Sequence, residues 1–144
     1  MVALDVENIQ IAESVDLAFA SYILLADNIV LVRYKTYDKE IGLEEAIQST
    51  DAVSRLTRDL PVSIIIDVRG CYINFSNEAR EYFARDTNYT EKRKSQALVI
   101  DGLAHKLVAN FYMRFNRPTC PVAVFENPQE ALEWTRKIRT PEKE

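Results

Sequence analysis

The sequence predicts a single α/β domain with a mixed, mainly parallel sheet of five strands, an N-terminal antiparallel hairpin and about four helices. Paired β-rich runs fill the first 40 residues, and strand and helix patterns alternate from there on. Three of the later runs are apolar without alternation, which is typical of strands buried on both faces of a parallel sheet. These runs are residues 63–68, 97–100 and 122–125.

The first half of the chain is expected to form the hairpin and one long helix. Strands at 17–25 and 29–35 flank the Asx-rich turn at residues 26–28. Residues 1–16 carry mixed signals and are expected to form an N-terminal arm or an edge extension of the sheet. From Leu43 apolar residues recur at helical spacing, and Pro61 then ends the helix.

The second half alternates strands with helices. Strands are expected at 62–67, 96–100 and 121–125, with a helix from Ser76 after the first and a helix over 103–116 after the second. The last helix opens at Asn127-Pro128, because Asn is a good N-cap and Pro suits the first helical position. The domain is thus expected to span residues 17–138, followed by a frayed tail at 139–144.

Composition limits the classes of function. With 144 residues and a net charge of −4, the chain is one domain of ordinary composition, and bulk electrostatics do not favour a nucleic-acid partner. Cys71 and Cys120 form no CxxC pair, which indicates free thiols in a reducing compartment. No run approaches the length of a membrane span and no secretory signal is visible, so a cytoplasmic location without membrane insertion is expected.

The strand–loop–helix unit SIIIDVRGCYINFSNEAREYF at residues 63–83 resembles the regulatory segment of STAS (SpoIIAA-like) domains. In that family a strand ends in Asp-Leu-Ser-Gly and a short loop leads to Asp-Ser-Ser/Thr-Gly. Asp67 and Gly70 match the first motif. The stretches SNEAREYFA and 95–135 resemble STAS-like bacterial proteins common in Bacteroidetes, so that the resemblance covers roughly residues 17–138.

The resemblance implies a SpoIIAA-like fold and a non-enzymatic, regulatory protein-interaction module of the anti-sigma-factor-antagonist type. The family's regulatory serine falls on Asn77, while Phe75 and Glu78 replace the flanking Asp and Gly. Ser76 is therefore expected to be the N-cap of its helix, with a phosphoacceptor role as the alternative. The expected partner-binding surface comprises Arg69, Cys71, Tyr72, Asn74, Ser76, Asn77 and Arg80.

Other candidate sites have simpler interpretations. His105 is the only histidine and has no partner at metal-ligand or relay spacing. Asp67, Asp101 and Glu126 follow three strands, where a rim of acids suits a cation. Acids also suit strand–helix turns and helix starts, so no metal is expected. Lys92-Arg93-Lys94 reads as part of a solvated loop. Cys71 lies beside Arg69, but a loop cysteine without a neighbouring base is weak evidence of nucleophilic catalysis. No catalytic residue and no cofactor is predicted.

The helix predicted at 103–116 has a wider apolar surface than it needs to pack against a sheet. Ala109, Tyr112 and Met113 lie beside its main stripe, which predicts a homodimer through this helix. The alternative is that the N-terminal arm at 1–16 folds back over this patch within one chain. An alternative function is a small-molecule or lipid carrier of Sec14-like architecture. A carrier should hold a sizeable apolar pocket, whereas an interaction module should present a shallow exposed patch.

Overall fold

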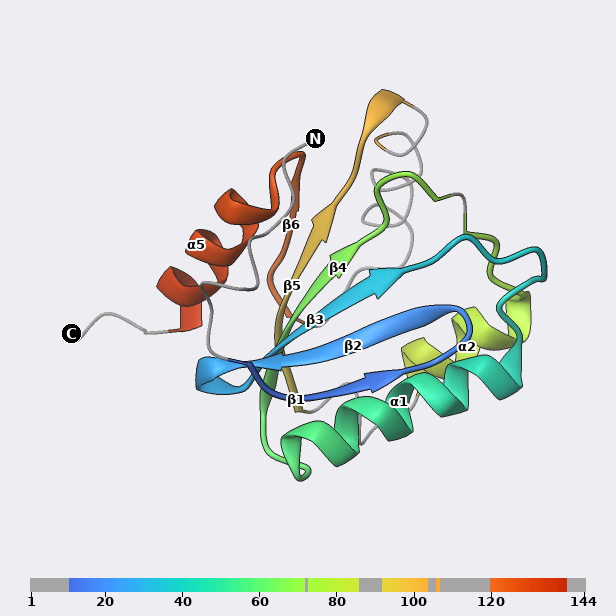
Figure 1. Ribbon diagram of the computed structural model, residues 1–144, viewed down its shortest axis with the longest axis horizontal. Helices are drawn as coiled ribbons and strands as arrows, with labels where there is room; N and C mark the ends of the chain where they lie inside the picture. The colour runs from blue at the N-terminus through green and yellow to red at the C-terminus, as the bar shows by residue number, and fades with distance from the viewer. Residues whose placement is uncertain (1–10, 72, 86–91, 104–105, 107–119, 140–144) are drawn as a thin grey trace.

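The computed structural model describes residues 11–71, 73–85, 92–103, 106 and 120–139. Within these residues the chain forms one six-stranded sheet with the strands in sequence order (Figure 1). The strands are β1 (Ile11–Asp16), β2 (Ala20–Leu25), β3 (Ile29–Tyr34), β4 (Val62–Asp67), β5 (Arg93–Val99) and β6 (Val122–Phe125). The named α-helices are α1 (Leu43–Thr57), α2 (Asn77–Arg85) and α5 (Pro128–Arg139).

The sheet changes direction at β3. The pairs β1–β2 and β2–β3 are antiparallel, and the pairs β3–β4, β4–β5 and β5–β6 are parallel. The predicted hairpin and the parallel pairing of the last three strands are confirmed. The β2–β3 turn is a short 3-10 segment (Ala26–Asn28) in which Asp27 and Asn28 adopt φ of 67° and 57°, a region that Asx residues tolerate.

The predicted count of five strands is wrong, because part of the expected N-terminal arm is a strand. Ile11–Asp16 pairs with β2 and adds an antiparallel edge, so three of the five strand pairings in the described sheet are parallel. The edge-extension alternative is therefore the correct one for these residues. The strand expected at 17–25 begins at Ala20, and the one expected at 96–100 is β5.

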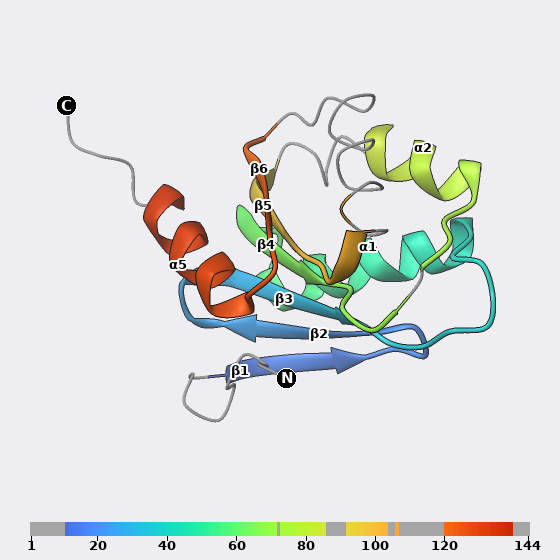
Figure 2. The same ribbon diagram turned by 90° about the horizontal axis from the view of Figure 1, so that it is seen from above.

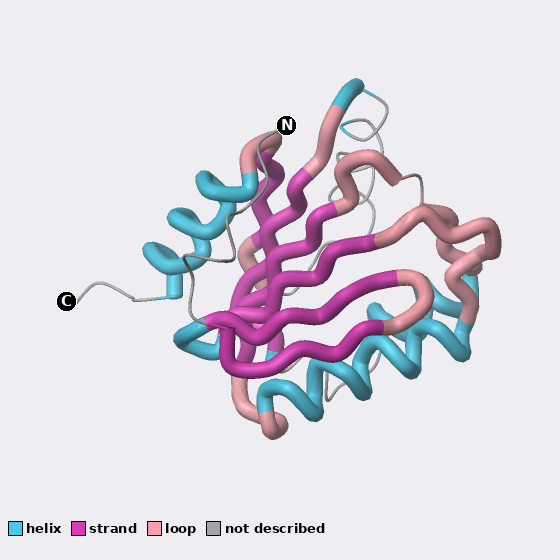
Figure 3. The backbone as a smooth tube through the Cα atoms, in the orientation of Figure 1, coloured by secondary structure: helices cyan, strands magenta, loops and turns pink. Residues whose placement is uncertain are grey.

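Helices cover both faces of the sheet (Figures 2 and 3). On one face, Val30 and Val32 of β3 share a core with Val53 and Leu56 of α1. On the other face, the alternate β3 residues pack with Ala131 and Leu132 of α5. This alternation is the two-residue period of a strand buried on both sides.

A buried hydrogen bond fixes α1 against the sheet. The Tyr22 hydroxyl of β2 donates to the Ser49 hydroxyl of α1 at 2.7 Å. Tyr22 is fully buried, so this bond satisfies a polar group that burial would otherwise leave unpaired. The predicted helix at 103–116 lies outside the described residues apart from Leu103 and Lys106, and so do residues 140–144 of the expected tail.

Candidate functional site

The loop after β4 is organised by one carboxylate. Both oxygens of Asp67 accept hydrogen bonds from the Arg69 guanidinium, each at 3.0 Å, and the Arg69 backbone N–H donates to the same carboxylate at 3.1 Å. The two side chains are only 8% and 13% exposed. A bidentate, largely buried pair of this kind fixes the loop's direction as it leaves the strand.

A second carboxylate joins this loop to the end of the neighbouring strand. Asp101, just past β5, accepts a hydrogen bond from the Gly70 backbone N–H at 3.1 Å. Gly70 has a φ of +76°, which favours glycine at this turn. Asp67 and Asp101 therefore act as anchors of the loop in this structure.

The Cys71 thiol points inward. Its Sγ donates to the Tyr34 carbonyl oxygen at 3.3 Å, and the residue is 8% exposed. Burial raises the pKa of this thiol above its ordinary value, and the nearby carboxylates of Asp67 and Asp101 act in the same direction. A buried thiol with a raised pKa is a poor nucleophile.

The start of α2 is clamped to the segment that precedes α1. Ile41 and Phe75 form an isolated parallel bridge. The Ile41 N–H donates to the Asn74 carbonyl at 2.8 Å, and the Ser76 N–H donates to the Ile41 carbonyl at 2.9 Å. The Ser76 hydroxyl oxygen accepts from the Ala79 backbone N–H at 3.0 Å, so Ser76 caps α2 as expected.

The body of α2 then packs on α1. The Tyr82 hydroxyl shares a hydrogen bond of 2.8 Å with the Thr50 hydroxyl of α1. On the inner side, Phe75 makes edge-on contacts with Tyr34 and Phe83, with ring centroids 6.1 Å apart in each pair. These aromatic contacts fix α2 to the sheet as well as to α1.

The structure narrows the predicted partner-binding surface. Asn74, Asn77 and Arg80 are exposed and Ser76 is half-buried. Arg69 is mostly buried against Asp67 and Cys71 is buried, so these two side chains are structural rather than available at a surface. Tyr72 lies outside the described residues, as do His105 and the predicted self-association residues Ala109, Tyr112 and Met113.

The interpretation of Lys92-Arg93-Lys94 as a solvated loop is wrong for its central residue. Arg93 opens β5 and is 8% exposed, with its guanidinium donating to the Gln96 side-chain oxygen at 3.1 Å. Arg93 and Lys94 belong to β5. The strand begins four residues before the apolar run at 97–100 from which it is predicted.

Sequence reasoning also missed a cavity of about 220 Å³ between α1, α2 and the start of β4. Asp59 closes one side by accepting a bond from the Ser54 hydroxyl and pairing with Lys92 at 3.6 Å. The lining mixes hydroxyl, charged and apolar side chains, in contrast to the apolar pocket expected of a lipid carrier. Its residues are Thr50, Asp51, Val53, Ser54, Thr57, Asp59, Leu60, Val62, Tyr82 and Lys92.

In the described part of the chain, no three His, Cys, Asp or Glu side chains gather as a metal site would require. Over those same residues, the helices are too short or too polar to cross a bilayer.

Comparison with known families decides where the chain belongs. Residues 23–139 match the model of a domain of unknown function, DUF7793. The chain belongs to the DUF7793 family. This DUF7793 chain matches no functionally curated protein.

A crystal structure shares the architecture of this DUF7793 domain. It is an uncharacterized protein of the DUF3478 family with a SpoIIAA-like fold, from Shewanella loihica PV-4, solved at 2.25 Å resolution. The TM-score is 0.57 at 16% sequence identity, over 88% of this chain and 91% of that one. The likeness shows that the DUF7793 chain has a SpoIIAA-like, STAS-like fold, as the sequence resemblance implies.

Proposed function

We propose that the chain is a non-enzymatic protein-interaction module with a regulatory role, working through the exposed start of α2. We define the α2 rim as Asn74, Asn77 and Arg80, the exposed members of the predicted surface. The observation that carries the proposal is the backbone clamp between Ile41 and residues 74–76, which fixes the rim in one geometry. A backbone that is already held in its bound geometry loses little conformational entropy on binding.

The chemistry of neighbouring side chains supports a role in binding over catalysis. The groups that might have been reactive beside the rim are engaged in building the loop: Asp67 holds Arg69, Asp101 holds Gly70, and the Cys71 thiol bonds a carbonyl. The exposed polar side chains of the α2 rim are then the groups left to bind a partner. Cys71 and Cys120 form no disulfide with each other, which supports the proposed location in the reducing cytoplasm.

The proposal is tested by capturing partners from the native cell on the immobilised full chain. The wild type is compared with the Asn77→Ala/Arg80→Ala variant and with a matched control on α5, Gln129→Ala/Arg136→Ala, whose residues are also exposed. Quantitative mass spectrometry should show a protein retained by the wild type and the control and lost from the rim variant. Equal retention by all three would contradict the proposed function.

A further inference from the structure

One flank of α1 exposes two large apolar side chains. Leu43 and Ile47 are 40% and 39% exposed, and their spacing of four residues places them on the same side of the helix. Thr50 lies on that side too, and it bonds Tyr82 of α2. Leu43 and Ile47 therefore border the seam between α1 and α2.

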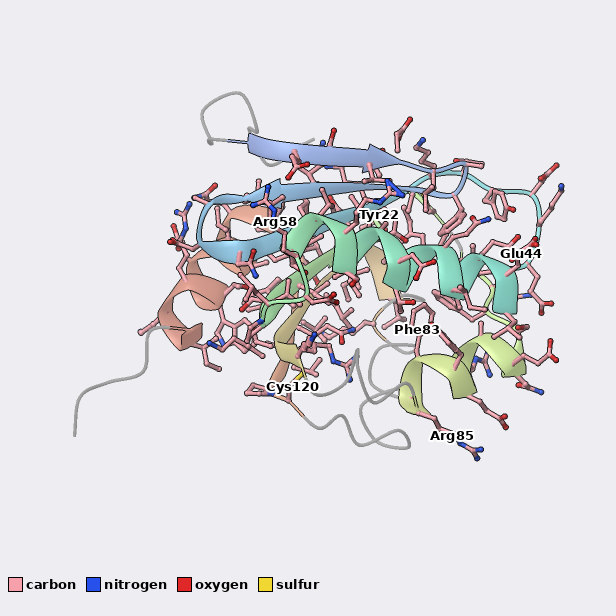
Figure 4. The ribbon with its side chains drawn as sticks, turned by 90° about the horizontal axis from the view of Figure 1, so that it is seen from below. Tyr22, Glu44, Arg58, Phe83, Arg85 and Cys120 are labelled. Atoms are coloured by element: carbon pink, nitrogen blue, oxygen red, sulfur yellow. The ribbon has the colours of Figure 1, made fainter. Side chains whose placement is uncertain are left out.

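The acidic residue Glu78 borders the same seam from the other helix. α1 and α2 are in contact and run in the same direction, with their N-terminal ends together (Figure 4). Moving one turn towards the N-terminus from the Thr50–Tyr82 bond brings Glu78 of α2 level with residues 46–47 of α1. Arg80 is two residues from both Glu78 and Tyr82, which is about 160° around α2 from each, so it points away from α1.

The segment that leads into α1 and forms its first half is rich in acidic residues. Between residues 38 and 51 the chain has one base, Lys39, and five acids, which are Asp38, Glu40, Glu44, Glu45 and Asp51. Of these six residues, Glu45 is half-buried and the other five are exposed. Glu78 adds another exposed carboxylate from α2. Glu44 and Asp51 lie within about 60° of Ile47 around α1, so the apolar pair has carboxylates beside it and complements a surface that is apolar and basic.

We propose that the α1–α2 seam docks a basic amphipathic segment of a partner protein. Its apolar side chains cover Leu43 and Ile47, and its lysines or arginines lie opposite Glu44 and Glu78. This inference rests on the proposed function and names the chemistry of the partner. Asn77 of the α2 rim is next to Glu78 in the chain, so a partner that covers the start of α2 can reach both the rim and the seam.

The test uses two synthetic helical peptides of about 16 residues, a length at which isolated helices begin to form. Both carry leucine at positions i, i+3, i+4 and i+7; the remaining positions are lysine in one and glutamate in the other. Titration into the isotope-labelled full chain is followed by NMR. The lysine peptide should bind at least about ten-fold tighter, because of the carboxylates. Its largest amide shifts should fall in residues 43–50 and 76–83.

Variants locate the contact. Ile47→Ser is expected to weaken the lysine peptide about ten-fold by removing apolar contact. Glu78→Lys should weaken it and reduce its salt dependence. The control Glu133→Lys makes the same charge change at an exposed position on α5, on the other face of the sheet, and should leave affinity unchanged. Circular dichroism confirms that each variant is folded.

Three outcomes would overturn the inference. One is equal binding of the two peptides, or no binding of either. Another is that the peptide shifts NMR amide signals only in α5 or β1. The third is self-association of the chain that Ile47→Ser abolishes, which would make a second copy the occupant. If native partners depend on Asn77 and Arg80 but not on Leu43 and Ile47, only the seam inference fails and the proposed function stands.

Discussion

Replacing Asp67 with asparagine should destabilise the domain, because Arg69 would keep its charge while losing its carboxylate. Breaking a buried ion pair from one side costs about 3–5 kcal/mol. The Arg69 side chain is 13% exposed, so water partly reaches it and the expected loss of unfolding free energy lies at the lower end, about 3 kcal/mol. For a domain of this size that corresponds to a fall in Tm of about 6–12 °C.

The assay is urea unfolding followed by the fluorescence of Trp134. This is the single tryptophan, and it packs on Phe125 with ring centroids 5.7 Å apart, away from the changed residues. The double variant Asp67→Asn/Arg69→Met should lose less than the sum of the single variants, with a coupling of at least about 1 kcal/mol. Arg55→Met, on an exposed part of α1, is the control and should stay within about 0.5 kcal/mol of wild type.

A loss below about 0.5 kcal/mol for Asp67→Asn, or strict additivity in the double variant, would refute this reasoning. Arg69 would then not depend on Asp67. It would return to the set of side chains available to a partner.

Three further predictions concern single side chains. Ser76→Ala should lower the unfolding free energy by about 1 kcal/mol, since the Ala79 N–H loses its acceptor. The backbone N–H groups of Glu45 itself and of Gly42 lower the pKa of the Glu45 carboxyl below its ordinary 4.5. The stability advantage of wild type over Glu45→Gln should therefore be present above pH 4.5 and shrink as acid protonates the carboxylate. Cys71 should react with a thiol reagent on the order of 100-fold more slowly in the native state than in urea.

Each of these has a contradicting result. Unchanged urea midpoints for Ser76→Ala would show that its hydroxyl contributes no cap. A wild-type advantage over Glu45→Gln that grows on acidification would reverse the expected sign. Native-state labelling of Cys71 as fast as in urea would mean that the loop after β4 opens freely.

Elements with strong local signals could be predicted from the sequence. The apolar run of β4 is bounded by Pro61 and ends at Asp67, and the structure places the strand at the predicted residues. The Asn127 side chain accepts from the Gln129 N–H at 2.7 Å, so the predicted cap of α5 is present. In both cases chain chemistry within a few residues decides the boundary.

Features that depend on distant partners could not be predicted. β1 mixes apolar and polar residues without the continuous apolar run of the later strands, and it is a strand because β2 offers it a hydrogen-bonding edge. The cavity exists only because α1 and α2 pack at a particular distance, which the Thr50–Tyr82 bond sets. The burial of Arg69 did have a local signal, because an acid two residues earlier at a strand end can turn an arginine inward.

The most direct test of the interaction surface is hydrogen–deuterium exchange of the full chain, alone and saturated with the partner captured from its native cell. If the α2 rim and the seam form the contact, peptides covering residues 43–50 and 74–85 should exchange more slowly in the complex, while peptides from α5 at 128–139 should be unchanged. Slower exchange confined to α5 or to the β1 edge, with no change over 43–50 and 74–85, would contradict it.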